Sequence, residues 1–459
     1  MAPSAVSCTP FFIKPDSRGD YSRLGGRVRA PADSAVPAIL DVMSSSKTVA
    51  AGNLDSADSY ESAIDWRSFV ESVQEALRVD RLDGWLLYDF RGINRIAADI
   101  AGVSRQKGHL ATRRWYYLIP ATGTPRGLVH AIERNTLAHL PGSANRYAGR
   151  GQLEEGLRAL VGGLRRVAME YSPQCAIPYI SRVDGGTIEL VRSFGIEIAS
   201  SGDLVQRFST VWDERAMATH LRASDKLYRV KDLAFELIAR RVRDRVPTTE
   251  FDIQQQMASW FHEEGLVTDS DPCVAASINT GNPHYLPTAA ESRRISADEI
   301  VLLDLWGKLE APGAVFADIT WVGYTGSRVP DRFASAFAAI REARDRAVAV
   351  VQDAVRAGRD LRGWEVDRAA SDVLRTGGFA EGILHRTGHS LGESVHGNGV
   401  NIDDYETRDD RRLLPGTGFT IEPGLYFEDF GVRTEINMIV TKRDALVTGP
   451  LQTEILNLV

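Results

Sequence analysis

Residues 422–435, EPGLYFEDFGVRTE, read as a β-hairpin with a glutamate at each open end. A turn centred on residues 428–429 places Glu422 opposite Glu435. Apolar residues follow both strands and predict a buried hairpin; they are Phe419, Ile421, Leu425, Tyr426, Val432, Ile436 and Met438. Burying a lone carboxylate is costly unless it is paired or binds a metal ion. The two glutamates therefore need a partner from elsewhere in the chain.

A second apolar hairpin carries another pair of acids. In VLLDLWGKLEAPGAVFADITW, residues 301–321, the segment 310–313 is a good turn. A hairpin folded about Ala311 places Asp304 directly opposite Asp318. Like charges in cross-strand positions destabilise a sheet. A cation between the two aspartates would remove this conflict.

Histidines are concentrated in one glycine-rich segment, HRTGHSLGESVHGNG, residues 385–399. It holds His385, His389 and His396, out of nine histidines in the chain. One imidazole and four carboxylates form a ligand set rich in hard oxygen atoms. Such a set suits two divalent ions such as Mn²⁺, with Co²⁺ or Zn²⁺ as alternatives. Two metal ions hold a bridging hydroxide and polarise a carbonyl group.

The motifs DITW, HRTGH, EPGLY and VRTE resemble those of the pita-bread metallopeptidases, which include Xaa-Pro aminopeptidases, prolidases, methionine aminopeptidases and creatinase. The resemblance covers about residues 220–455 and implies an ordered ligand set: Asp304, Asp318, His389, Glu422 and Glu435. The preceding region resembles the smaller α/β domain of the aminopeptidase P, prolidase and creatinase branch. Methionine aminopeptidases lack that domain, and creatinase has lost metal ligands that this chain keeps.

The resemblance also implies roles for residues around the metal. His284, in TGNPHYLPT, matches a substrate-side histidine, and His396 matches the histidine that donates to the carbonyl or oxyanion. His385 matches a proton-shuttling histidine, while Tyr426 and Arg433 match residues that shape the site and bind substrate. Each has a simpler structural alternative, because Arg433 can neutralise buried acid and His385 can be structural.

This sequence departs from the family pattern at three places. The spacing between the two aspartates is longer than usual, Arg386 stands where glycine is common, and Ile436 follows Glu435 where relatives often carry an acid. These departures concern the substrate more than the metal site.

The resemblance implies a dinuclear-metal exopeptidase that cleaves Xaa-Pro bonds, of the aminopeptidase P or prolidase type. Glu422 would take up the proton of the water that forms the bridging hydroxide, and would orient that hydroxide toward the carbonyl. Two alternatives stay open. One is a relative with other chemistry, such as a lyase of small zwitterions or a hydrolase of organophosphorus esters. The other is a non-catalytic binding protein, which the complete ligand set disfavours.

The remaining sequence predicts the organisation of the chain. Residues 1–62 are rich in Ser, Ala, Gly, Pro and Asp and predict a disordered extension, with a start at Met43 or a transit peptide as alternatives. Residues 63–215 alternate strands and helices and predict an α/β domain, which the resemblance implies is creatinase-like. Residues 216–459 segregate helices from strands and predict an α+β domain, which the resemblance implies is the pita-bread domain.

Bulk composition narrows the classes of partner. The net charge is −7 and basic residues are dispersed, so nucleic acid is not an expected partner. No apolar run is long enough for a membrane span. The three cysteines match neither a disulfide framework nor a metal motif, which predicts a reducing, cytoplasmic location. We expect a homodimer that acts on small peptides.

Overall fold

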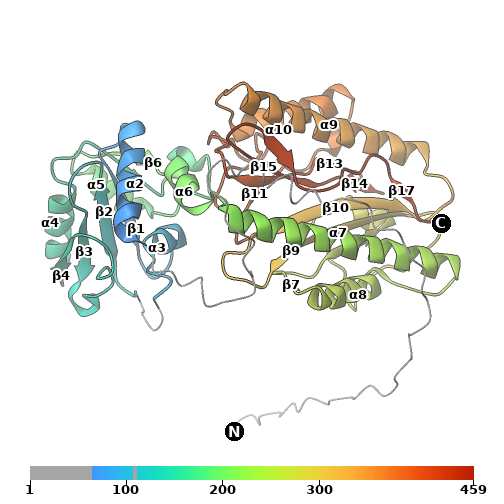
Figure 1. Ribbon diagram of the computed structural model, residues 1–459, viewed down its shortest axis with the longest axis horizontal. Coiled ribbons are helices and arrows are strands. Elements are labelled where there is room, and N and C mark those ends of the chain that lie inside the picture. Colours follow the sequence, from blue (N-terminus) through green and yellow to red (C-terminus); the bar gives the residue numbers. More distant parts are fainter. Residues whose placement is uncertain (1–64, 107–110) are drawn as a thin grey trace, which may run out of the picture.

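The computed structural model describes residues 65–106 and 111–459 (Figure 1). The extension expected at residues 1–62 lies outside the described residues. The helices are α2 (Trp66–Val79), α3 (Arg95–Ile100), α4 (Arg150–Val161), α5 (Gly185–Arg192), α6 (Gly202–Ser209), α7 (Glu214–Arg243), α8 (Glu250–Glu263), α9 (Asp331–Arg356) and α10 (Gly363–Thr376).

The strands of the first half are β1 (Gly84–Asp89), β2 (Trp115–Pro120), β3 (Arg126–His130), β4 (Ser143–Tyr147), β5 (Arg166–Met169) and β6 (Glu197–Ser200). Those of the second half are β7 (Leu266–Val267), β8 (Cys273–Ala276), β9 (Ile300–Leu309), β10 (Ala317–Tyr324), β11 (Ser390–Leu391), β12 (Gly418–Ile421), β13 (Gly424–Tyr426), β14 (Gly431–Arg433), β15 (Ile436–Val440), β16 (Ala445–Val447) and β17 (Leu456–Asn457).

The first half is a sheet with helices on both faces. Its strand order is β4-β3-β2-β1-β5-β6, antiparallel at β1–β2 and parallel at β1–β5 and β5–β6. Trp85 and Leu87 of β1 join the core under α2, whereas Leu86 and Tyr88 join the core under α4 and α5. Because both faces of β1 are covered, residues 85–88 form a continuous hydrophobic run instead of alternating with polar residues.

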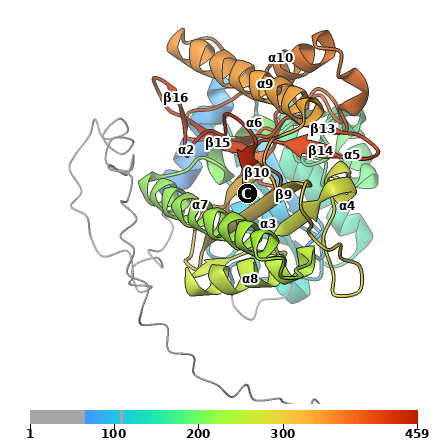
Figure 2. The same ribbon diagram turned by 90° about the vertical axis from the view of Figure 1, so that its right-hand side faces the viewer.

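The second half places strands between two pairs of helices (Figures 1 and 2). Helices α7 and α8 pack against odd-numbered residues of β9, including Leu303 and Leu305. Even-numbered residues such as Ile300 and Leu302 join a second core with α9 and α10. Since side chains alternate along a strand, Asp304 faces the α9/α10 side, toward the strands β11–β16.

Thr249 caps the N-terminus of helix α8. The Thr249 hydroxyl accepts from the backbone N–H of Asp252 at 3.1 Å, and the Asp252 carboxylate accepts from the backbone N–H of Thr249 at 2.8 Å. This reciprocal pair satisfies backbone donors that the first helical turn leaves free.

The hairpin at residues 422–435 has the predicted register. Gly424 pairs with Arg433 on β13–β14, and Ile421 pairs with Ile436 on β12–β15, so Glu422 and Glu435 lie opposite each other between the two ladders. The ladder parts at this point: the backbone N–H of Glu422 donates to Thr387, and that of Glu435 donates to Thr320. Each glutamate is thereby tied to a different neighbouring segment.

The predicted register of the other hairpin is wrong. Asp318 pairs with Trp306 and Asp304 pairs with Thr320, so the two aspartates are diagonal neighbours instead of direct partners. The connection spans 310–316, because β9 ends at Leu309 and β10 begins at Ala317. This long loop moves the centre of the hairpin from residue 311 to residue 312. A shift of two in register keeps both aspartates on one face and separates their Cβ atoms to about 7 Å.

In the described part of the chain, no helix combines the length and the apolar character needed to cross a membrane.

Candidate metal centre

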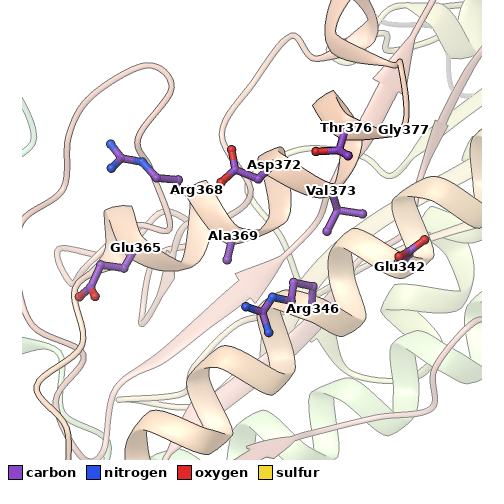
Figure 3. Close-up of a pocket in the computed structure, with 9 residues that line it drawn as sticks. All are labelled: Glu342, Arg346, Glu365, Arg368, Ala369, Asp372, Val373, Thr376 and Gly377. Carbon is purple, nitrogen blue, oxygen red and sulfur yellow. The ribbon is translucent and has the colours of Figure 1, made fainter.

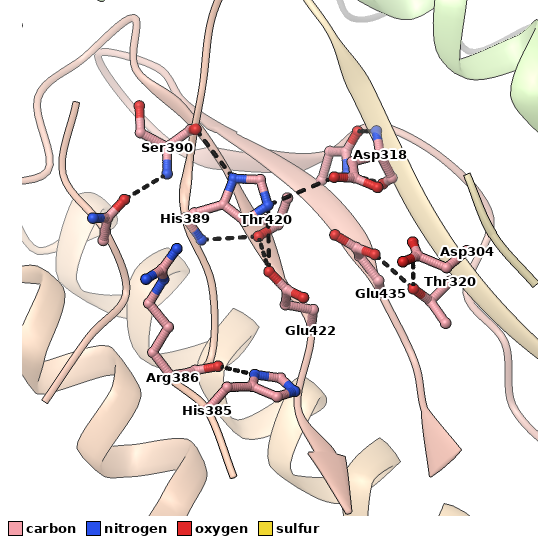
Figure 4. Close-up of polar contacts among 12 residues, drawn as sticks. Asp304, Asp318, Thr320, His385, Arg386, His389, Ser390, Thr420, Glu422 and Glu435 are labelled. Atoms are coloured by element: carbon pink, nitrogen blue, oxygen red, sulfur yellow. Dashed lines mark hydrogen bonds and ion pairs between the residues drawn. The ribbon is translucent and has the colours of Figure 1, made fainter. Parts of the chain in front are cut away.

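Five acidic and histidine side chains converge between the two layers of strands (Figure 4). They come from β9 (Asp304), β10 (Asp318), the residue before β11 (His389) and the two sides of the parted hairpin (Glu422 and Glu435). His389 Nε2 lies 3.6 Å from Asp318 Oδ2 and 3.4 Å from Glu422 Oε1. Potential ligand atoms of Asp318, His389 and Glu435 all lie within 4.8 Å of one another.

The hydrogen bond of His389 defines which nitrogen faces these acids. His389 Nδ1 lies 3.2 Å from the carbonyl oxygen of Ser390. A carbonyl only accepts, so Nδ1 carries the hydrogen and burial lowers the pKa of the ring, which favours its neutral form. Nε2 then presents a lone pair to two carboxylates. A cation between them turns this repulsive arrangement into a ligand set.

Two buried oxygen atoms in this cluster lack any hydrogen-bond partner among the described residues. They are Asp318 Oδ1 and Glu435 Oε1. Buried carboxylate oxygens are nearly always hydrogen-bonded or bound to a metal ion. The unpaired oxygens and the His389 lone pair therefore fit divalent cations, held by Asp304, Asp318, His389, Glu422 and Glu435.

A threonine and an arginine hold the acids in place. Thr320 Oγ1 lies 2.7 Å from Glu435 Oε2 and 3.1 Å from Asp304 Oδ1, and its single hydrogen serves one acid at a time. Arg433 donates from Nε to Thr320 Oγ1 at 3.0 Å and from Nη2 to Asp304 Oδ2. Such contacts behind metal ligands fix their orientation.

The charges of the cluster shift its pKa values in opposite directions. Burial, with repulsion from neighbouring carboxylates, raises the pKa of Asp318 and of Glu435 well above the usual range. Burial acts in the same sense on Glu422, but the neighbouring positive groups, Arg433 and Arg386 among them, outweigh it and hold the pKa of Glu422 below its usual value. Without metal, Asp318 and Glu435 are therefore the carboxyl groups that hold a proton most readily, and Glu422 is the one that ionises most readily.

The sequence of this chain is similar to those of known proteins. Residues 223–442 match the model of metallopeptidase family M24. A probable dipeptidase PepE of Mycobacterium tuberculosis is 31% identical over 213 residues, which are 45% of this chain and 52% of that protein. A Xaa-Pro dipeptidase of Lactobacillus helveticus is 29% identical over 211 residues, 46% of this chain and 52% of the relative. The chain spans about half the length of the curated relatives it matches.

Over residues 223–442, the chain belongs to metallopeptidase family M24.

Solved structures extend the likeness in fold to most of the chain. The crystal structure of dipeptidase PepE from Mycobacterium ulcerans superposes with a TM-score of 0.60 and covers 86% of this chain and 98% of its own, at 22% identity. The predicted fold class, a pita-bread domain preceded by a smaller α/β domain, is confirmed by this match together with the six-stranded sheet of the first half and the strands packed between helix pairs in the second half.

The M24 ligand cluster opens into a cavity of about 780 Å³. Its lining includes His284, His385, His396 and Arg433 beside all five candidate ligands. Tyr426 is buried behind the wall, where its hydroxyl lies 2.8 Å from His385 Nε2. The structure therefore gathers every sequence-predicted site residue at or directly behind one cavity.

The histidines of the M24 cavity differ in their surroundings. His396 is exposed at the cavity mouth, and its ring contacts that of His389 edge-on with centroids 4.3 Å apart. Loss of hydration on the cavity side and the nearby His389 lower the pKa of His396 to about 4, so the ring is neutral at pH 7 and keeps one N–H to donate. His385 is held at both nitrogens, by Tyr426 and by the Arg386 carbonyl.

Sequence reasoning missed three residues of this site. Thr320 follows Asp318 by two positions, and a correct hairpin register would have placed it among the acids. Arg386 and Tyr179 also line the cavity. Arg386 was visible as a departure from the family pattern, but no local signal marks Tyr179, which is brought in from the first half of the chain.

Proposed function

We propose that the protein is a metal-dependent exopeptidase that hydrolyses Xaa-Pro bonds, of the aminopeptidase P or prolidase type. One observation carries the proposal: four carboxylates and a neutral imidazole converge at the wall of a cavity, and two of the carboxylates each have a buried oxygen atom without a hydrogen-bond partner among the described residues. The names of the matched relatives, Xaa-Pro dipeptidase and dipeptidase among them, support the choice of peptides as substrates.

Asp304, Asp318, His389, Glu422 and Glu435 would hold two divalent ions, with Mn²⁺ expected and Co²⁺ or Zn²⁺ as alternatives. When bound, these ions supply Lewis acidity toward water and toward a peptide carbonyl. Glu422 takes up the proton of the attacking water, because it is the carboxylate that the surrounding positive groups keep ionised.

The histidines support the later steps of the same proposal. His396 donates its N–H to the carbonyl oxygen as negative charge develops there. His284, which is exposed at the cavity wall, and His385 carry a proton toward the leaving nitrogen. Tyr426 and Arg433 fix His385 and Asp304, since the Arg433 Nη1 donates to the Tyr426 hydroxyl at 3.2 Å. The expected homodimer, the cytoplasmic location and the domain boundaries at 62 and 215 stay predictions.

A substrate panel tests the proposal. The full chain, loaded in turn with Mn²⁺, Co²⁺ and Zn²⁺, is assayed on Xaa-Pro dipeptides, Xaa-Pro-Xaa tripeptides and matched Xaa-Ala peptides. We expect cleavage before proline that chelation abolishes. Turnover of organophosphorus esters without cleavage of any Xaa-Pro peptide would overturn the proposal and favour the other chemistry.

A further inference from the structure

Two arginines line the cavity, and one of them is fully committed to the protein. Arg433 donates from Nε to Thr320, from Nη1 to the Tyr426 hydroxyl and the Pro283 carbonyl, and from Nη2 to Asp304. Each of its nitrogens thus has a protein acceptor. Arg433 therefore has little capacity left to bind an anionic group of a substrate.

Arg386 has donors to spare. Its Nη1 donates to the Tyr179 hydroxyl at 2.7 Å and to Glu406 Oε2 at 3.3 Å, whereas its Nε and Nη2 donate to none of the described residues. The Arg386 side chain is only 13% exposed, and its one acidic partner, Glu406, is 42% exposed. A long contact with a solvated carboxylate neutralises a guanidinium only weakly.

Tyr179 adds a further donor and fixes the geometry. Its hydroxyl oxygen accepts from Arg386, and its own hydrogen has no acceptor among the described residues. The guanidinium carbon lies 5.6 Å from the Tyr179 ring centroid. A guanidinium oriented in this way keeps a rigid fork of donors suited to a carboxylate.

Arg386 lies at the wall of the cavity that holds the candidate metal ligands. It lies three residues before His389 in the sequence. Figure 4 shows its side chain beside His389 and Glu422. A group bound there is thus close to the atoms that would be cleaved.

We propose that Arg386, oriented by Tyr179, binds a carboxylate of the peptide substrate. The inference rests on the proposed function and makes it more specific. Two sources supply this chemistry: the terminal carboxylate of a Xaa-Pro dipeptide, or an acidic side chain next to the proline. In either case Arg386 determines which peptides the enzyme accepts.

The test compares matched substrates that differ only in the carboxylate. Leu-Pro is paired with Leu-Pro-amide, and Glu-Pro-amide is paired with Gln-Pro-amide. The variants are Arg386→Gln, Arg386→Lys and Tyr179→Phe. Arg346→Gln is the control, because Arg346 lies in an exposed groove between α9 and α10, outside the cavity (Figure 3). The readout is kcat/KM together with binding of L-proline and L-prolinamide measured by calorimetry.

We expect the parent enzyme to prefer one acid over its neutral partner by about 10- to 100-fold, the scale of a hydrogen bond to a charged group. The pair that shows the preference identifies the source of the carboxylate. Arg386→Gln should abolish the preference mainly through KM. Arg386→Lys and Tyr179→Phe should each retain part of it, and Arg346→Gln should retain all of it.

An unchanged acid-to-neutral ratio in Arg386→Gln would overturn the inference, and continued Xaa-Pro cleavage would leave the proposed function intact. Thermal melting identifies a variant that fails to fold. If Arg386→Gln fails to fold, the acid-to-neutral ratios of Tyr179→Phe and Arg386→Lys test the inference instead. If the parent cleaves no Xaa-Pro peptide, the proposed function fails. The carboxylate site then stands if, in the parent but not in Arg386→Gln, L-proline binds more tightly than L-prolinamide or Glu-Pro-amide binds more tightly than Gln-Pro-amide, and it fails if both pairs bind alike.

Discussion

Thr320 places one hydroxyl between two candidate metal ligands and an arginine. Its oxygen accepts from Arg433, and its hydrogen reaches either Asp304 or Glu435. Because the residue is completely buried, water does not replace this contact. The hydroxyl therefore sets the orientation of two acids that belong to different strands.

Thr320→Val keeps the shape of the side chain and removes the hydroxyl. We expect metal affinity, measured by competition with a chelating dye, to fall about 10- to 100-fold, as is typical when contacts behind metal ligands are lost. Thr325→Val is the control, because Thr325 is buried on the same segment and donates to Ser296, away from the site. Equal metal affinities for the two variants would show that Thr320 has no such role.

His396 and Asp318 should respond differently to substitution. His396→Ala should keep both metal ions and lower kcat by about 10²–10³, the scale for loss of one oxyanion donor. Asp318→Asn removes a charged ligand, so metal content itself should fall. Metal analysis beside steady-state kinetics on a Xaa-Pro peptide distinguishes the two. Turnover of His396→Ala at nearly the parent rate would remove His396 from the mechanism.

At the scale of elements, the metal cluster depends on a hairpin that parts in the middle. Glu422 and Glu435 lie where β12 gives way to β13 and β14 gives way to β15. The backbone N–H groups of the two glutamates do not pair across the hairpin. They donate instead to the carbonyl oxygens of Thr387 and Thr320. Both side chains consequently meet Asp318 and His389 from adjoining segments.

The acids of this hairpin should destabilise the metal-free fold as pH rises. The folded-state pKa of Glu435 is raised, so the folded protein holds a proton that the unfolded chain has already released. From pH about 4.3, the ordinary glutamate pKa, up to the raised folded value, the free energy of unfolding therefore falls as pH rises.

Glu435→Gln removes this titration. In the presence of chelator, the melting temperature of the variant should exceed that of the parent by a margin that grows as pH rises from about 4.3 toward the raised folded-state pKa of Glu435. Metal should reverse the order, because the parent then gains a ligand that the variant lacks. A constant difference between the two chelated proteins at every pH would refute the account of crowded carboxylates.

The sequence predicts the register of the hairpin at 422–435 correctly, because its turn is short. It predicts the register of the hairpin at 301–321 wrongly, because its connecting loop is long. Residues 428–429 fix the pairing of Glu422 with Glu435, whereas the loop at 310–316 allows several registers and only the fold selects one. Strand β4 is largely exposed and lacks an apolar pattern, so the sequence carries no signal for it. Tyr179 could not be predicted at all, since its contact with Arg386 spans 207 residues.

At the scale of the whole molecule, both halves of the chain contribute to one cavity. The M24 half supplies the candidate ligands, and the preceding half supplies Tyr179. Aromatic and guanidinium groups from separate halves thus meet at the cavity wall. Substrate selection should therefore depend on the α/β half, although the metal chemistry does not.

Removing the metal should lower the stability of the whole chain as well as its activity. Ions that bind only the folded state stabilise it by about 2.7 kcal/mol at a hundredfold excess over Kd. Calorimetry of metal-loaded and chelated protein should thus show a lower melting temperature after chelation, restored by Mn²⁺. Identical melting curves after verified removal would contradict a metal site in this buried cluster.

The most direct test of the central claim is the crystal structure of the Mn²⁺-loaded protein with anomalous diffraction measured near the manganese edge. We predict two anomalous peaks, each within ligand distance of carboxylate oxygens from Asp304, Asp318, Glu422 and Glu435, with His389 Nε2 bound to one of them. Asp318 Oδ1 and Glu435 Oε1, which have no partner in the described structure, should both contact metal. A loaded crystal with no peak in this cluster, or with any of the five side chains turned to solvent, would contradict the account.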